Sequence, residues 1–230
     1  MLPYDVASRV GIVKPEVIAA AGRLDGVLAE LDDTAARAPS GLPGWSRGHV
    51  VTHLANFSEA MTRQVDEALA GRLVEMYDGG RPARDAAIEA GAGRPAEELR
   101  QHVSRATTGL IAAWERVDDW TRPVRHRDST LGATVYAGWR ELEVHTVDLA
   151  MAPTSDEWSE EFCLHLLDFL RPRTPDGLHL ILDTGENRWE NGSGEPRVLS
   201  GRLTDLTAWM AGRQPREPLT GDLPELAPWP

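Results

Sequence analysis

The stretch WRELEVHTVD, residues 139–148, decides both the fold and the candidate site. Glu141 and His145 stand four residues apart in it, which on a helix places both side chains on one face, about one turn apart. A carboxylate oxygen and an imidazole nitrogen so placed can bind one metal ion from a single helix. The spacing alone is weak evidence, because such pairs are usually solvated helical pairs. Glu143 is the rival carboxylate. It is two residues from His145 in the sequence, so on a helix its side chain should point away from that of His145.

A second pair of histidines precedes this stretch. His49 and His53 stand four apart in RGHVVTHLA, residues 47–55. We expect His53 to supply the third ligand from a facing helix, whereas His49 should be a partly exposed residue of the first helical turn. Three protein ligands of the His/His/Glu type leave a fourth position open, which is typical of catalytic rather than structural zinc.

Helical periodicity predicts a bundle in the first two thirds of the chain. The long helices are expected over residues 15–37, 46–69, 95–117 and 135–151. Pro15 suits a first helical turn, Ser46 suits an N-cap, and residues 83–90 favour a short helix. The polar connection over 119–133 should include a short extended piece. Four long helices with polar connections predict a four-helix bundle, in which metal sites are built from facing helices.

The pattern changes at Pro153, which divides the chain into domains over 1–153 and 154–230. The second domain is expected to contain a helix over 158–170, a buried strand over 178–182, a hairpin of strands over 187–190 and 197–199, and a helix over 202–211 with Gly212 as its C-cap. The predicted fold class is therefore α+β, a helical bundle followed by a small α/β domain.

Composition narrows the function classes. The chain has 230 residues, a formal net charge of −12 and a pI near 5.0, which argues against nucleic acid or an anionic membrane surface as the main partner. Residues 1–5 show no signal-peptide pattern and no apolar run is long enough to span a membrane, so a cytoplasmic protein is expected.

The chain has one cysteine, Cys163, so an internal disulfide is excluded. Cys163 is expected to be buried and not catalytic. Core positions are expected for the tryptophans at 45, 114, 120 and 139.

Several segments resemble one known family. They are LPGWSRGHVVTHLA at 42–55, Met76-Tyr77, ARDAAIEAGA at 83–92, RELEVHTVDL at 140–149 and WMAGR at 209–213. In this order and spacing they resemble the mycothiol-dependent maleylpyruvate isomerase family of the DinB-like superfamily. The resemblance spans nearly the whole chain. The segments around His53 and His145 are together fairly specific, whereas WMAGR alone is a weak signal.

The resemblance implies a DinB-like four-helix bundle that binds zinc, or another divalent metal, through His53, Glu141 and His145. It implies that the metal works with the low-molecular-weight thiol mycothiol on a small-molecule substrate, in a chain we expect to be a monomer. Arg213 matches a family arginine of the C-terminal domain that acts on the substrate, and Arg84 matches a second arginine near the site. Many relatives have a second histidine where this chain has Thr146, a residue expected to point away from the site.

The implied reaction is a cis–trans isomerisation. Zinc makes the thiol a thiolate, which adds to the cis double bond of maleylpyruvate; the resulting single bond rotates, and elimination gives fumarylpyruvate. Arginines suit the two substrate carboxylates and the enolate formed on addition. Asp148 is either an orienting partner of a ligand imidazole or a salt-bridge partner at the helix end. Two alternatives stay open: a mycothiol S-transferase with the same site, and a non-enzymatic, metal-dependent binding module.

Overall fold

The computed structural model describes residues 6–230, so the segment Met1–Asp5, on which the absence of a signal peptide was judged, lies outside it. The chain forms two compact units, one ending at Ala152 and one running from Pro153 to Pro230. Each is described by itself below. In the described part of the chain, no helix combines the length and the apolar character that crossing a membrane requires.

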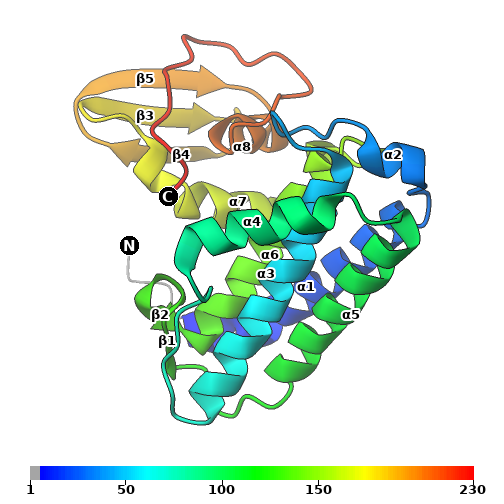
Figure 1. The fold of residues 1–230 in the computed structure, drawn as a ribbon. Coiled ribbons are helices and arrows are strands. Elements are labelled where there is room, and N and C mark those ends of the chain that lie inside the picture. The colour runs from blue at the N-terminus through cyan, green and yellow to red at the C-terminus, as the bar shows by residue number, and fades with distance from the viewer. Residues whose placement is uncertain (1–5) are drawn as a thin grey trace. The chain divides into compact units, whose positions relative to one another are not determined.

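The first unit is a four-helix bundle with two short additional helices (Figure 1). Its elements are α1 (Val6–Leu28), α2 (Asp33–Arg37), α3 (Arg47–Leu69), α4 (Gly80–Ala92), α5 (Ala96–Trp114), β1 (Pro123–Val124), η1 (His126–Asp128), β2 (Ser129–Thr130) and α6 (Leu131–Asp148). Helices α1, α3, α5 and α6 form the bundle, and α4 packs on α3. The two-stranded ribbon β1–β2 is the extended piece expected between α5 and α6. The predicted bundle is confirmed.

The prediction of one helix over 15–37 was wrong. Helix α1 runs through Pro15 and ends at Leu28, and α2 is a separate helix. Pro15 is accommodated because Val13 and Val17 on either side of it are buried, which offsets the missing backbone hydrogen bond. A new helix begins after Asp32 because its side chain accepts a hydrogen bond from the Ala35 N–H at 2.7 Å, as an N-cap does.

Helix α4 lies unusually close to α3 because two glycines leave room for it. A Cβ atom at Gly48 would lie 2.2 Å from the carbonyl oxygen of Ala92, and one at Gly91 would lie 2.5 Å from the side chain of Thr52. Both positions therefore exclude a side chain. This close approach fixes α4, and with it Arg84, relative to the His53 helix.

The second unit is a three-stranded sheet with helices. Its elements are η2 (Ser155–Glu157), α7 (Glu160–Phe169), η3 (Arg171–Arg173), β3 (Leu178–Asp183), β4 (Arg188–Gly192), β5 (Glu195–Ser200) and α8 (Leu203–Met210). Strand β3 is central, antiparallel to β4 and parallel to β5 (Figure 1). Leu180, Leu199 and Leu206 are fully buried in its core. The predicted α+β fold class is confirmed.

The prediction of a hairpin between residues 187–190 and 197–199 was wrong. The strands there, β4 and β5, do not pair with each other, because β3 lies between them. The chain passes from β4 to β5 across the start of β3, where a Cβ at Gly192 would lie 2.2 Å from Leu178 O and one at Gly194 would lie 2.1 Å from Gly177 O. Both glycines have positive φ, +82° and +130°. The two glycines therefore allow the chain to pass close to the start of β3, and they do not form a hairpin turn.

Candidate metal centre

Three side chains from two facing helices meet inside the bundle. His53 Nε2, from α3, lies 2.8 Å from Glu141 Oε2 and 3.1 Å from His145 Nε2, both from α6. His145 Nε2 lies 3.3 Å from the same carboxylate oxygen. These are the residues that the sequence proposes as ligands, and among the described residues they form the one group of at least three His, Cys, Asp or Glu side chains with metal-binding geometry.

The start of α3 is tied to the end of α6, which brings the ligands together. The Arg47 guanidinium donates to the carbonyl oxygens of Leu149, at 2.7 Å, and Ala150, at 2.9 Å. The Gly41 N–H donates to Asp148 O at 2.7 Å. These donors satisfy carbonyl groups that a helix end leaves without partners. The register between the two helices is thereby set one to two turns from His53 and His145.

His49 has a different task. Ser46 is the N-cap of α3, and the His49 ring completes its capping box: the Ser46 N–H donates to His49 Nδ1 at 3.1 Å. The ring also stacks on Trp45, with centroids 6.0 Å apart. His49 thus stays in the first helical turn, as expected, and is not part of the converging group. Glu143 faces α1 and forms an ion pair with Arg23 there, so it points away from His145.

Asp148 orients the His145 ring. Its carboxylate lies 2.8 Å from His145 Nδ1, and its side chain is 2% exposed. A proton on Nδ1 then donates to Asp148, and Nε2 faces His53 and Glu141. This arrangement is common for metal-binding histidines, whose other ring nitrogen is held by a carboxylate. Of the two roles considered for Asp148, the geometry favours the orienting one.

The two histidines differ in their electrostatics. Burial lowers the pKa of His53. Burial also acts to lower the pKa of His145, but its hydrogen bonds with Asp148 and Glu141 outweigh this and raise the pKa to about 9. Burial acts against ionisation of Glu141, yet hydrogen bonds with His145 and His53 hold its pKa well below the usual range. The metal-free group therefore presents an ionised carboxylate between His53, whose pKa is lowered, and His145, whose pKa is raised.

The donor set fits a divalent metal such as zinc. Two imidazole nitrogens and one carboxylate oxygen are ordinary zinc ligands, and tetrahedral ligands about 2.0–2.2 Å from zinc are themselves about 3.4 Å apart. The observed separations of 2.8–3.3 Å are slightly shorter than this. A small outward movement of the side chains would accommodate an ion.

Arg84 lies on the other side of the His53 ring. Its Nη2 is 3.2 Å from His53 Nδ1, and its Nη1 donates to Asp85 at 2.7 Å. A guanidinium only donates, so Nδ1 accepts in this contact. Metal binding through Nε2 would place the ring proton on Nδ1, and Arg84 would then have to leave it. Arg84 therefore lies at the site, as the sequence proposes, in a contact that a bound metal would release.

Other side chains around the ligands were not singled out from the sequence. Trp45 was expected in the core but is half-buried, with its ring 5.8 Å from that of His53. Phe57 lies between His53 and His126, with ring centroids 6.4 Å from each. The sequence carries no signal for His126, because it lies in an irregular connection. Trp114 and Trp139 are core residues, as expected, while Trp120 is half-buried.

The rim of the site is positively charged. Burial lowers the pKa of His126 to about 4, helped by the nearby charges of Arg127 and Arg140. Burial lowers the pKa of Arg140 itself to about 10. Burial raises the pKa of Tyr77, which hydrogen-bonds with Arg84, to about 12. Arg84 thus lies near His53, and Arg140 lies near Glu141 and His126.

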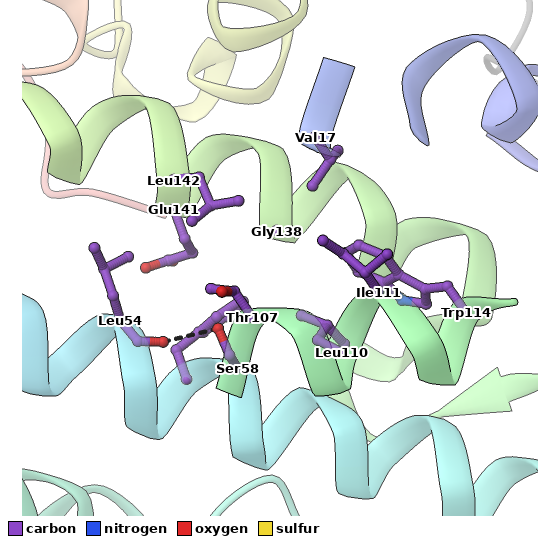
Figure 2. Close-up of a pocket in the computed structure, with 11 residues that line it drawn as sticks. Val17, Leu54, Ser58, Thr107, Leu110, Ile111, Trp114, Gly138, Glu141 and Leu142 are labelled. Atoms are coloured by element: carbon purple, nitrogen blue, oxygen red, sulfur yellow. Dashed lines mark hydrogen bonds between the residues drawn. The ribbon is translucent and has the colours of Figure 1, made fainter. Parts of the chain in front are cut away.

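Below the carboxylate the bundle is apolar. Figure 2 shows Glu141 and Leu142 of α6 opposite Leu54 of α3, above a small pocket that Leu110 and Trp114 of α5 also line. Its polar members, Ser58 and Thr107, donate to carbonyl oxygens of their own helices. The ligand group therefore borders an apolar region of low dielectric constant, which strengthens electrostatic interactions within the group.

Arg213, the second proposed catalytic residue, belongs to the second unit. It follows α8 directly after Gly212, which has φ +72°. The Arg213 N–H donates to Ala208 O and the Gly212 N–H donates to Trp209 O, both at 2.8 Å. These two bonds form a Schellman motif, so Gly212 ends the helix as predicted.

The fold and the ligand group define a class: helical-bundle proteins with a His/His/Glu centre between two facing helices. Residues 17–150 match the family model of the mycothiol maleylpyruvate isomerase N-terminal domain, and the chain belongs to this family. No curated protein gives a significant match.

Two crystal structures share the fold of the whole chain. One is the mycothiol-dependent maleylpyruvate isomerase, which is 23% identical, with a TM-score of 0.87 over 96% of this chain and 97% of that one. The other is a mutant of an isomerase of the same name with one histidine replaced by alanine, at 22% identity and a TM-score of 0.86 over the same shares. At this identity the likeness establishes the fold alone.

Proposed function

We propose that the chain is a metal- and mycothiol-dependent cis–trans isomerase of maleylpyruvate or a similar unsaturated dicarboxylate. The observation that carries the proposal is the convergence of His53, Glu141 and His145, in a chain that belongs to the mycothiol maleylpyruvate isomerase family. The chain would act as a monomer, with a small-molecule substrate and a thiol as its partners.

The three residues would hold a divalent metal, with zinc as the first candidate. When bound, the ion supplies a positive charge that keeps a coordinated thiol in its thiolate form near neutral pH. Asp148 would keep His145 Nε2 directed at the ion by accepting a hydrogen bond from Nδ1–H. Trp45 and Phe57 cover the His53 ring and restrict the access of water to it.

The arginines support the choice of substrate class. Arg84 lies against His53, and Arg127 and Arg140 are close enough to His126 to affect its pKa. Guanidinium groups bind carboxylates through paired hydrogen bonds, and a dicarboxylate needs two such contacts. We propose Arg84 and Arg213 as the catalytic arginines that bind the substrate carboxylates and the enolate formed when thiol adds.

The chain's own cysteine does not suit the role of nucleophile. Cys163 is fully buried in α7 of the second unit, whereas the ligand group belongs to the first unit. The burial of Cys163 supports the use of an external thiol. The name of the matching family, mycothiol maleylpyruvate isomerase, points to the same kind of thiol.

The test is a turnover assay with zinc-loaded protein, mycothiol and maleylpyruvate, in which metal and thiol are each left out in turn. We expect fumarylpyruvate only when both are present. Formation of product at an unchanged rate without metal, or without thiol, would contradict the proposal. His49→Ala serves as the matched control for His53→Ala, because both histidines lie on α3 and only His53 belongs to the ligand group.

A further inference from the structure

His126 lies in the connection between α5 and α6, and both sides of its backbone are held by side chains. Its N–H donates to Gln64 Oε1 at 3.1 Å, and its carbonyl oxygen accepts a hydrogen bond from Ser129 Oγ at 2.6 Å. Gln64 is buried on α3, where its Nε2 donates to Val74 O at 2.7 Å. The Gln64 amide therefore joins two connections, one that carries His126 and one that carries Met76.

The backbone directly after His126 is strained. Arg127 and Asp128 both have a positive φ, at +55° and +45°, which residues other than glycine rarely adopt. Such strain persists only where the surrounding contacts outweigh it, and it is concentrated at functional sites. The conformation that presents His126 is therefore held by its contacts and is not the one that the local sequence prefers.

Met76 determines which ring nitrogen of His126 carries the proton. His126 Nδ1 lies 2.9 Å from Met76 Sδ, and a thioether sulfur accepts hydrogen bonds but has no proton to donate. The contact is a hydrogen bond only when Nδ1 is protonated, which leaves a lone pair on Nε2. Burial, with the nearby charges of Arg127 and Arg140, lowers the pKa of His126 to about 4, so Nε2 stays unprotonated at neutral pH.

The Nε2 atom of His126 is available to a bound molecule. Among residues 6–230 it has no hydrogen-bond partner, and the side chain is only half-buried, so a small molecule can reach it. The other histidines of the first unit have polar contacts at both ring nitrogens; they are His49, His53, His102 and His145. His126 therefore differs from them in keeping one ring nitrogen open.

This open nitrogen belongs to a ring near the candidate metal centre. The Phe57 ring lies 6.4 Å from the rings of both His53 and His126, so His126 is one aromatic ring away from a proposed metal ligand. Glu141 is close enough for its charge to oppose the lowering of the His126 pKa. The edge of the centre thus contains a neutral hydrogen-bond acceptor that no residue of the described chain uses.

We propose that His126 is a binding residue of this site, with Nε2 accepting a hydrogen bond from a hydroxyl group of the bound molecule, and that Gln64 and Met76 are its positioning residues. The inference deepens the proposed function and rests on it for the identity of the bound molecules. Maleylpyruvate has two carbonyl groups one carbon apart, so it presents an enol hydroxyl, and the sugar rings of mycothiol also carry hydroxyls. An ionised carboxylate only accepts hydrogen bonds, so it binds at the arginines and not at Nε2.

The position of the proton is tested by ¹⁵N NMR of the zinc-loaded, full-length protein with labelled histidine. The signals of His126 are identified by their absence in His126→Gln. We expect the Nδ1–H form in wild type, and a shift towards the Nε2–H form, which free histidine favours, in Met76→Leu. This variant keeps the ring and removes only the sulfur. A predominant Nε2–H form in wild type would overturn the proposal.

Binding is tested by calorimetry with two probes added separately to zinc-loaded protein. One is mycothiol, and the other is acetopyruvate, which has the enol of maleylpyruvate but no double bond to which a thiol can add. We expect His126→Leu to bind one of the probes about 3- to 10-fold more weakly, the usual effect of losing one hydrogen bond. His126→Gln, whose Oε1 can take the place of Nε2, should recover most of this affinity. The weakened probe identifies which hydroxyl is bound.

His102→Leu is the matched control, because His102 is also half-buried in the first unit but both its nitrogens are used, by Glu59 and Arg94. It should bind both probes like wild type. Unchanged binding of both probes by His126→Leu would overturn the proposal, as would equal weakening of both, equal weakening in His102→Leu, or absence of binding by wild type.

A second variant covers the case in which His126→Leu does not fold. Met76→Leu keeps the His126 ring, and we expect it to weaken the binding of one probe, because Nε2 is then protonated in part of the molecules. Binding of both probes as in wild type would overturn the proposal in that case. Absence of isomerase turnover with the expected binding pattern intact would reject the proposed function and leave this binding site standing.

Discussion

At the scale of single residues, the candidate centre depends on the different surroundings of two histidines. Both contact the same oxygen of Glu141, but His53 lies among aromatic rings whereas His145 is held by Asp148. One histidine therefore has a lowered pKa and the other a raised one. In the metal-free protein at neutral pH, His145 should be protonated, and a metal must displace that proton to bind.

The raised pKa of His145 predicts a pH dependence of stability. A pKa that is higher in the folded state, about 9 against the usual 6.5, gives stabilisation that is complete below pH 6.5 and is lost as pH rises through 9. We expect the unfolding free energy of metal-free protein to fall by on the order of 2 kcal/mol over this window. Urea unfolding from pH 6 to 10 checks this, with His145→Gln as the control. An unchanged slope in the control would contradict the assignment to His145.

Substituting the two histidines of α3 should give opposite results. His53→Ala removes a donor from the ligand group and should strongly lower metal content, while the bundle stays folded on its apolar core. His49→Ala should keep the metal and cost about 1 kcal/mol of stability, as the loss of a helix cap usually does. Elemental analysis of desalted protein, with unfolding curves, measures both. Unchanged metal content in His53→Ala would exclude this residue as a ligand.

At the scale of helices and strands, sequence patterns correctly predicted the features that depend on residues close together in the sequence. Periodicity located the bundle helices, and the spacing of Glu141 and His145 placed them on one helical face. The split between α1 and α2 was missed because Pro15 lies inside a helix whose buried face outweighs it. The pairing of β4 with β3 was missed because strand order depends on contacts distant in sequence, and a Gly-rich connection can mark a crossing as well as a turn.

The close packing of α4 on α3 gives a prediction at this scale. Gly48→Ala would put a Cβ 2.2 Å from Ala92 O and should force the two helices apart, at a cost of about 1–3 kcal/mol. Gly26→Ala, at an exposed position of α1, meets no atom within 4 Å and should stabilise the protein by about 0.5–1 kcal/mol. Chemical denaturation measures both. A neutral Gly48→Ala would show that the two helices can separate without cost.

At the scale of the whole molecule, the residues of the proposed site come from both units. The ligand group and Arg84 belong to the first and Arg213 to the second. Sequence spacing and resemblance together proposed the three converging residues, but neither could settle the role of Asp148, which depends on a ring orientation. Trp45 was expected in the core and His126 was not assigned to the site, because both lie in loops, where no periodicity fixes the direction of a side chain.

The single cysteine allows a test of where the reactive thiol comes from. Cys163→Ser places a hydroxyl in a fully buried position and should cost about 1–3 kcal/mol of stability. Turnover of the folded, metal-loaded variant should remain close to wild type and should still require mycothiol. Steady-state kinetics at several thiol concentrations measures this. Loss of activity in a folded, metal-loaded variant would contradict the use of an external thiol.

The most direct test of the central claim is the balance of thiol during turnover. Zinc-loaded protein is supplied with maleylpyruvate in large excess over mycothiol, and free thiol and fumarylpyruvate are followed together. An isomerase returns the thiol after each cycle, so we predict that product exceeds thiol many times over while the thiol concentration stays constant. Consumption of one thiol for each substrate molecule would contradict the account and identify an S-transferase instead.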